Sequence, residues 1–528
     1  MHRLRSIRVW LTLLVLIGPA IAASGAAEAD ARNAAVLSIT TQEVKDHVGV
    51  LADDTFEGRA AGSRGNRAAG IYIVQRLKKF GVHGGGPKQT FYQTFATYHN
   101  ILGLVEGSDP TLKDQTIVIS AHYDHVGYGK PGNSFGPLGR IHNGADDNAS
   151  GVAGLLEVAG AVGRLPEKPK RSILFAFWDG EEGGLIGSKH WVDHPTIPLN
   201  RVPIMINADM IGRLRNSNLK VFGTRTSRDL RWLVSRQNDG EDLLLDFDWE
   251  IKADSDHHTF YSHDIPYVMM HTGMHGDYHR PSDDADKINN EGLKQIAQLI
   301  FKILVELADA PELGGFRRQA RQESRADQQA VGRALPPPPG RLGVGWDEIA
   351  AKKGMIVITG VKSGSAAAKA GLRSGDRVLQ FAGREISDLR QFRLSVLTAN
   401  SPVAVTVQRP AEASQRELSV DLPGDPVRLG ISWRTDDAEP GCVIINRLTP
   451  GSPADLAELH VNDRIHRIGG QEFTTSEEFR QATTAPGALV LEVESAGRVR
   501  SVEIPPIDAP LQDAPHSESV EPKIPTAP

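Results

Sequence analysis

Histidine and carboxylate side chains recur at the ends of short apolar runs in this 528-residue chain. They form five sites: His122-Tyr123-Asp124, Asp146-Asp147 within Gly144–Gly151, Glu181-Glu182 after Phe175–Trp178, Asp209 after Asn207, and His279 after a His-dense stretch. Each site alone would be an ordinary turn, helix cap or solvated charge pair. Five of them together predict a shared crevice, and clustered carboxylates are unfavourable there unless cations neutralise them.

The chemistry of these side chains indicates a metal centre. Imidazole and carboxylate ligands without a thiolate suit Zn²⁺, with Mn²⁺ or Co²⁺ as substitutes. The single cysteine, Cys442, excludes a cysteine-based zinc site and an intramolecular disulfide. Five ligands with one shared carboxylate would make a two-metal site, which activates a water and polarises a carbonyl.

The elements that must position these residues alternate in type between about residues 36 and 312. Apolar runs typical of buried strands lie at Ile117–Ser120, Ile173–Trp178, Pro203–Ala208 and Pro266–His271. Helical patterns lie at Asn66–Phe80, Gly151–Arg164 and Ile288–Ala308. This alternation predicts an α/β domain with a doubly wound, mostly parallel central sheet. Because the C-terminal ends of parallel strands face one crevice, residues far apart in sequence converge there.

In order and spacing, these motifs resemble the M28 family of co-catalytic zinc peptidases, which includes bacterial leucyl-type aminopeptidases and glutamate carboxypeptidases. The resemblance covers about residues 40–310. It implies five ligands for two Zn²⁺ ions: His122 and Asp209 on one, Glu182 and His279 on the other, and Asp147 bridging. It also implies that Glu181 is the general base and that Asp124 hydrogen-bonds the far nitrogen of His122.

Some positions inside this match stay open. The family pattern makes the second aspartate the bridge, which leaves Asp146 as a turn or supporting residue. Among the six histidines from 257 to 279, His279 fits because Arg280-Pro281-Ser282-Asp283 follows it, whereas His257 and His258 belong either to a specificity pocket or to the core. Lys252 and Ala253 stand where some relatives carry a tyrosine, so the resemblance does not identify an oxyanion-stabilising residue.

A later region is an internal duplication. A constant offset of 87 residues aligns Arg341-Leu342-Gly343-Val344 with Arg428-Leu429-Gly430-Ile431, and Asp376-Arg377 with Asp463-Arg464. The two copies resemble PDZ domains of exported bacterial proteases. The resemblance implies small β-rich domains that bind peptide C-termini by β-augmentation or only brace the catalytic domain. The carboxylate-binding loops would be Leu342, Gly343 and Val344, and Leu429, Gly430 and Ile431.

The N-terminal segment predicts export. Arg3, Arg5 and Arg8 precede a short apolar run, and small residues follow, as in a secretory signal peptide over residues 1–23. We therefore expect a bacterial periplasmic or secreted protein whose mature chain has no transmembrane segment. The expected parts are a peptidase domain (36–312), a linker (313–340), PDZ-like domains (341–425 and 426–507) and a disordered tail (508–528). A net charge of −6 without a one-sign block excludes a nucleic-acid partner.

These features together predict an exported di-zinc exopeptidase of aminopeptidase type that acts on peptides or small proteins. Three alternatives remain. A glutamate-carboxypeptidase-like hydrolase would be favoured by clustered arginines, which are not evident near the ligands. A glutaminyl cyclase on the same scaffold works with one zinc, and a non-catalytic PDZ scaffold would not need Glu181.

Overall fold

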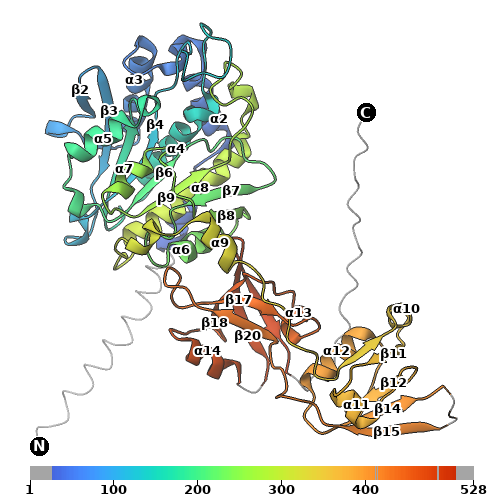
Figure 1. The fold of residues 1–528 in the computed structure, drawn as a ribbon. Coiled ribbons are helices and arrows are strands. Elements are labelled where there is room, and N and C mark those ends of the chain that lie inside the picture. The colour runs from blue at the N-terminus through green and yellow to red at the C-terminus, as the bar shows by residue number, and fades with distance from the viewer. Residues whose placement is uncertain (1–26, 411, 413, 485–486, 507–528) are drawn as a thin grey trace, which may run out of the picture. The chain divides into compact units, whose positions relative to one another are not determined.

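The computed structural model describes residues 27–410, 412, 414–484 and 487–506, so the expected signal peptide and tail lie outside the described residues. The chain divides into two compact units (Figure 1). The first contains the residues up to Val331 together with 436–440 and 494–499, and the second contains the others from Gly332 onward. Within the described residues, no helix combines the length and apolar character needed to cross a membrane.

The first unit is built on one nine-stranded sheet in the order β1-β3-β5-β4-β6-β9-β7-β8, with β2 paired to β3. Its strands are β1 (His83–Gly84), β2 (Tyr92–Phe95), β3 (Tyr98–Val105), β4 (Thr116–His122), β5 (Ser172–Trp178), β6 (Met205–Ala208), β7 (Asn218–Phe222), β8 (Leu244–Asp248) and β9 (Tyr267–His271). The central strands β5, β4, β6 and β9 are parallel, whereas β3 joins β5 and β7 joins β9 antiparallel. The α/β class is confirmed, and the sheet is mixed, with parallel pairing at its centre and again between β7 and β8.

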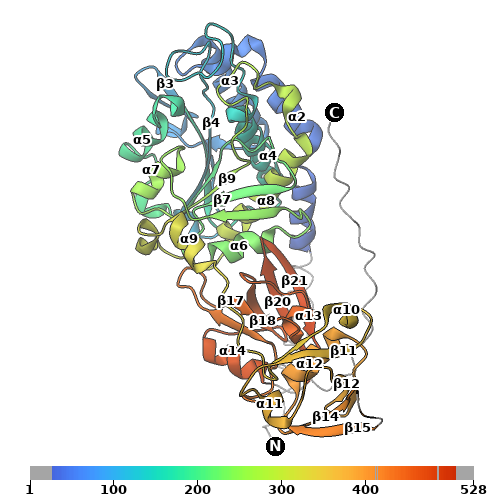
Figure 2. The same ribbon diagram turned by 45° about the vertical axis from the view of Figure 1, so that its right-hand side comes forward.

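Helices cover both faces of this sheet. They are a helix over residues 27–37, α2 (Thr41–Leu51), α3 (Arg64–Lys79), α4 (Gly151–Arg164), α5 (Ile186–Asp193), α6 (Leu230–Gln237), α7 (His257–Ser262), α8 (Asn290–Asp309) and α9 (Arg325–Val331). Figure 2 shows α2, α4 and α8 on one side of the strands and α5 and α7 on the other. Ile117 and Ile119 of β4 belong to the core formed with α4 and α8, and Val118 belongs to the core with Trp191 and Phe260. Burial on both faces explains why the central strands read as continuous apolar runs.

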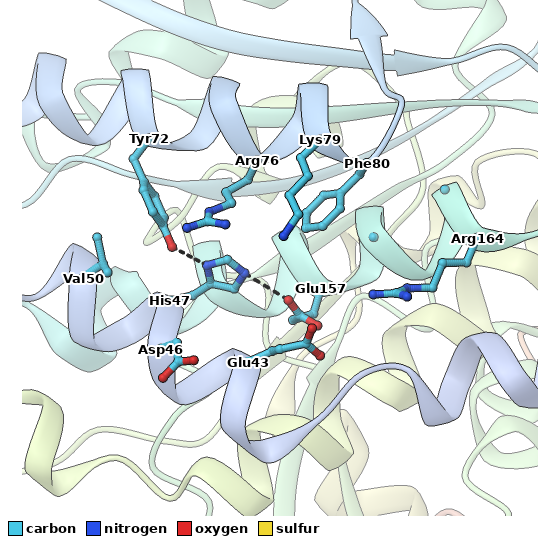
Figure 3. A pocket seen from close by; sticks show the side chains of 12 residues that line it. Glu43, Asp46, His47, Val50, Tyr72, Arg76, Lys79, Phe80, Glu157 and Arg164 are labelled. Atoms are coloured by element: carbon cyan, nitrogen blue, oxygen red, sulfur yellow. Dashed lines mark hydrogen bonds and ion pairs between the residues drawn. The ribbon is translucent and has the colours of Figure 1, made fainter.

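Helix α4 starts at the edge of the sheet that carries Asp147 and ends at a cavity of about 540 Å³ between α2, α3 and α4 (Figure 3). At this cavity, Nδ1 of His47 lies 2.6 Å from the Tyr72 hydroxyl and Nε2 lies 3.0 Å from Oε1 of Glu157. One side chain from each helix thus joins a single hydrogen-bonded chain. This chain of hydrogen bonds ties the middle of α4, the helix that follows Asp147, to α2 and α3.

The second unit contains two sheets of the same topology. Their orders are β10-β11-β12-β14-β15, with β13 on β12, and β16-β17-β18-β20-β21, with β19 on β18. The strands are β10 (Val344–Trp346), β11 (Ile356–Val361), β12 (Arg377–Phe381), β13 (Arg384–Glu385), β14 (Val403–Gln408), β15 (Gln415–Val420), β16 (Ile431–Arg434), β17 (Val443–Leu448), β18 (Arg464–Ile468), β19 (Gln471–Glu472), β20 (Leu489–Ser495) and β21 (Arg498–Ile504). The helices are α10 (Glu348–Ala351), α11 (Ala366–Ala370), α12 (Leu389–Thr398), α13 (Pro453–Leu456) and α14 (Ser476–Thr483). The repeated order confirms the duplication.

Candidate active site

The parallel strands bring the chemistry-bearing residues to one edge of the sheet. His122 ends β4 and pairs in register with Trp178, which ends β5 just before Glu181. Strand β6 runs parallel to β4 and ends one residue before Asp209. Their convergence follows from strand order, because parallel neighbours end on the same side.

Asp147 lies between two groups of ligand-type atoms. Its Oδ1 is 3.3 Å from Nε2 of His122, which is 3.4 Å from Oδ1 of Asp209. Its Oδ2 is 3.1 Å from Nε2 of His279, which is 3.0 Å from Oε2 of Glu182. The two oxygens of one carboxylate therefore face two different groups, which is the arrangement that a bridging ligand requires.

The electrostatics of these groups fit a divalent cation. Burial would raise the pKa of Asp147, but the imidazoles around it hold the pKa well below its usual value. Burial likewise would lower the pKa of His279, but Asp147 and Glu182 raise it to about 10. In each group the ligand atoms lie within 4.8 Å of one another. Such buried nitrogen and oxygen donors suit Zn²⁺. When bound, the ion would supply the positive charge that protonated imidazoles supply in its absence.

His125 joins one of these groups, and the sequence analysis missed it. Its Nδ1 lies 2.8 Å from Oε1 of Glu182 and 3.7 Å from Oδ2 of Asp147. The structure therefore contains two possible metal-holding groups: His122, Asp147 and Asp209, and His125, Asp147, Glu182 and His279. The signal was in the sequence, since this second histidine follows His122 by three residues.

Glu181 belongs to neither group of possible metal ligands among the described residues. Its backbone N–H donates to Oδ1 of Asp124 at 3.0 Å, so this carboxylate fixes the position of the glutamate. Burial raises the pKa of Glu181 well above its usual value. A carboxylate held beside the ligands without being one of them can exchange a proton with a substrate or water.

The predicted contact between Asp124 and His122 takes a different form. Nδ1 of His122 lies 3.2 Å from the backbone oxygen of Asp124 and 3.8 Å from its Oδ1. The backbone oxygen is therefore the hydrogen-bond acceptor, while the carboxylate accepts from the N–H of Glu181. The Asp124 carboxylate thus lies near the His122 ring and accepts a hydrogen bond from the N–H of Glu181.

Asp146 points away from the two groups. Its Oδ1 accepts from the N–H of Gly212 at 2.7 Å, and its Oδ2 lies 3.1 Å from Nε2 of His275. The neighbouring Asp283 accepts from the N–H groups of both Asp146 and Asp147. These contacts hold the Asp-Asp turn in place, which is the supporting role considered for Asp146.

A buried arginine also supports this turn, and no local sequence signal indicated it. Arg59 donates to the backbone oxygens of Leu51, Tyr123, Asn143 and Gly144, with distances between 2.6 and 3.0 Å. Gly144 has a φ of 56°, and a Cβ there would lie 2.2 Å from the backbone oxygen of Asp147. Arg59 therefore ties the end of α2 and the end of β4 to the segment before Asp147.

The remaining histidines divide between core and surface. His257 is 2 % exposed, its Nε2 is 3.0 Å from the backbone oxygen of Lys252, and burial lowers its pKa to about 3. His257 therefore belongs to the core, which was one of the two roles expected for it beside a specificity pocket. His258 is partly exposed, and its ring lies 5.8 Å from the ring of Tyr261.

Tyr278 is a further residue beside the two groups. Its ring stacks on His279 with a centroid distance of 3.9 Å. Burial raises the pKa of its phenol, and the carboxylates of Asp147 and Glu182 raise it further. The phenol therefore keeps its proton and can donate a hydrogen bond.

Each predicted PDZ loop contains a glycine in the left-handed region of backbone conformation. Gly343 and Gly430 have φ values of 79° and 83°, and a Cβ at either position would lie within 2.5 Å of a serine Cβ, that of Ser365 or Ser452. A cavity of about 270 Å³ lies beside β10 and α12 of the first copy, where Leu342, Val344, Trp346 and Phe392 line it. Pro337 and Pro338 of the preceding segment and Thr449 and Pro450 of the second copy line it as well. An apolar groove beside a strand is the form in which PDZ domains take a peptide.

Comparisons with known proteins agree with this division. Residues 100–304 match the sequence model of peptidase family M28, and residues 340–422 and 418–494 match PDZ domain models. The chain is similar to leupeptin-inactivating enzyme 1 of Streptomyces exfoliatus, at 28% identity over 47% of this chain and 52% of that protein. It is also similar to aminopeptidase YwaD of Bacillus subtilis, at 29% identity over 40% of this chain and 45% of that protein. The chain thus spans about half the length of these curated relatives.

The likeness to solved structures is weaker. The LapA aminopeptidase of Legionella pneumophila is 22% identical, covers 54% of this chain and 75% of its own, and gives a TM-score of 0.45.

Proposed function

Because this chain contains a peptidase domain of family M28 followed by two PDZ domains, we propose that it is an exported di-zinc aminopeptidase that removes N-terminal residues from peptides. Asp147 would bridge two Zn²⁺ ions, with His122 and Asp209 completing one site. Glu182 and His279 would complete the other. The observation that carries this proposal is the Asp147 carboxylate, whose two oxygens face the two groups.

The residues of the chain divide the chemistry between them. When bound, the two ions would lower the pKa of a water and polarise the scissile carbonyl. Glu181, held through its N–H by Asp124, accepts the proton of that water and delivers it to the leaving amine. Its raised pKa brings the carboxyl closer to neutral pH, where it can both accept and donate a proton.

Tyr278 is our proposed donor to the oxyanion of the tetrahedral intermediate. Its neutral phenol lies against the His279 ring, at the group that would hold one ion. A fixed hydrogen-bond donor near the developing negative charge stabilises the transition state more than the ground state. This assignment supplies the residue that the sequence left unidentified.

The PDZ domains would bind the C-termini of peptides or partner proteins through the Gly343 and Gly430 loops. The cavity beside β10 and α12 supports this role for the first copy. Export through the signal peptide, to the periplasm or the medium, remains part of the proposal on the sequence of residues 1–23.

The proposal is tested by metal content and a substrate panel on the purified full chain. We expect two zinc ions per chain and hydrolysis of aminoacyl substrates with a free amino group, but not of N-blocked ones. Cleavage of N-blocked substrates at a free C-terminus would indicate the carboxypeptidase alternative. One bound zinc ion together with cyclisation of N-terminal glutamine would indicate the cyclase. A protein that turns over none of these substrates, with one or two zinc ions bound, would be a binding scaffold.

A further inference from the structure

The cavity between α2, α3 and α4 is a second place in the first unit where polar side chains converge (Figure 3). None of its lining residues belongs to either group of possible metal ligands. Its volume of about 540 Å³ is within the range of small-molecule sites, which is about 300–1,000 Å³. The cavity is therefore large enough for a ligand of its own, separate from the candidate active site.

The charges that line this cavity are divided between its walls. Helix α2 contributes the carboxylates of Glu43 and Asp46, which we call the negative wall. Helix α3 contributes Arg76 and Lys79, the positive wall, and Arg164 adds a third cation at the end of α4. Figure 3 shows Arg76 and Lys79 extending from α3 and Glu43 lying on the opposite side of the cavity. Residues three or four positions apart share one face of a helix, so each wall carries a single sign of charge.

The two walls do not neutralise each other by direct contact. Among the residues that the structure describes, no ion pair joins the positive wall to the negative wall. The guanidinium of Arg76 lies instead over the ring of Tyr72, 4.9 Å from its centroid. The buried His47 is already bonded to the Tyr72 hydroxyl and to Glu157. A molecule with a charge of each sign would complement both walls at once.

Ligands with a single charge fit this lining less well. The negative wall repels a simple anion such as phosphate, and the positive wall repels a simple cation. The described lining residues also offer no group of three histidine or carboxylate atoms close enough to hold a metal ion. Val50 and Phe80 add apolar surface to the lining, against which an aliphatic side chain can pack.

We propose that this cavity binds a free amino acid. Its carboxylate contacts the positive wall, its ammonium group contacts the negative wall, and its side chain packs beside Phe80 and Val50. Charge-assisted hydrogen bonds at both ends favour this ligand over a molecule that lacks either charge. The charges of the lining identify the ligand, so binding at this cavity does not depend on the proposed aminopeptidase activity.

Calorimetry on the zinc-loaded full chain tests the proposal with leucine, with leucinol, which lacks the carboxylate, and with N-acetylleucine, which lacks the ammonium group. Lys79→Gln should weaken leucine binding at the cavity by at least about tenfold, because a charge-assisted hydrogen bond is lost, and should leave leucinol unchanged. Glu43→Gln should weaken leucine similarly and leave N-acetylleucine unchanged. The matched controls are Lys78→Gln, at an exposed lysine whose Nζ lies over the Phe91 ring outside the cavity, and Glu312→Gln, at an exposed glutamate.

Equal leucine affinities in Lys79→Gln and Lys78→Gln would overturn the proposal. An equal loss of leucine and leucinol in Lys79→Gln would also overturn it, because the lysine would then not contact the carboxylate. Inorganic phosphate that binds where leucine does not, and that Lys79→Gln releases, would indicate an anion site instead of an amino-acid site. Leucine bound at the zinc ions should be the same in every variant. Turnover plays no part in these titrations, so failure of the aminopeptidase proposal would leave their result unchanged.

Discussion

The imidazole of His125 contacts the carboxylate of Glu182, with 2.8 Å between Nδ1 and Oε1. The contact lies inside one of the two metal-holding groups and gives that group four side chains where the other has three. His125 is fully buried, so its contact with Glu182 is shielded from water. Whether it binds the ion or orients Glu182, it favours metal at this group.

We expect His125→Ala to weaken metal binding at the Glu182 group by about 10- to 100-fold, since residues that orient ligands contribute about this much to affinity. The measurement is zinc affinity by chelator competition, which should distinguish the site whose affinity falls from the site whose affinity is unchanged. His263→Ala, at an exposed histidine whose Nδ1 bonds a backbone oxygen, is the control. Equal affinities in His125→Ala and His263→Ala would remove His125 from the site.

The two adjacent aspartates should behave differently. Asp147→Ala removes the carboxylate that faces both groups, so the affinity for both metal ions should fall and activity should be lost. Asp146→Ala should keep both metals but lower the free energy of unfolding by about 1–3 kcal/mol, because the buried N–H of Gly212 loses its acceptor. Elemental analysis and denaturant unfolding check the two outcomes. Greater metal loss in the Asp146 variant would show that Asp147 is not the bridge.

Zinc affinity should depend steeply on pH. Although burial lowers the pKa values of His122 and His279, neighbouring carboxylates raise that of His279 to about 10 and that of His122 well above its usual value. Both imidazoles are therefore protonated at neutral pH in the metal-free protein, and zinc must displace those protons. Affinity should then rise with pH from 6 to 9, by about tenfold per unit for each displaced proton. Chelator competition, corrected for the chelator's own protonation, measures this dependence. A zinc affinity that does not change with pH would mean that the imidazoles are already neutral in the metal-free protein.

Tyr278→Phe tests the proposed oxyanion donor. The phenylalanine keeps the ring that stacks on His279, so metal content should stay unchanged. Loss of the hydroxyl should lower kcat by about a hundredfold with little change in KM, because the donor acts in the transition state. An unchanged kcat in the variant would leave the oxyanion to the metal ions alone.

The sequence predicted the elements whose pattern is periodic and buried. Strands β4, β5, β6 and β9 and helices α3, α4 and α8 lie where apolar runs and helical spacing indicated them. Strands β3, β7 and β8, which flank the central strands, were not predicted, because they carry mixed polar and apolar residues. The antiparallel pairing of β3 with β5 and of β7 with β9 depends on tertiary contacts for which the sequence carries no local signal.

The candidate site shows the same limit in its supporting contacts. Spacing at strand ends was enough to propose the carboxylates and histidines that the structure brings together. It did not reveal Arg59, which binds backbone oxygens up to 85 residues away. Nor did it reveal that the Asp124 carboxylate bonds the N–H of Glu181. Contacts to backbone atoms depend on folded geometry and leave no residue pattern.

The most direct measurement is the metal content and kcat of Glu181→Gln in the full chain. The account predicts that this variant keeps two zinc ions, because Glu181 belongs to neither ligand group, and loses at least about two orders of magnitude in kcat with the proton acceptor gone. The substitution keeps the backbone N–H that bonds Asp124, so the position of residue 181 is preserved. A variant that retains full activity, or that loses its zinc, would contradict the role of Glu181 as general base.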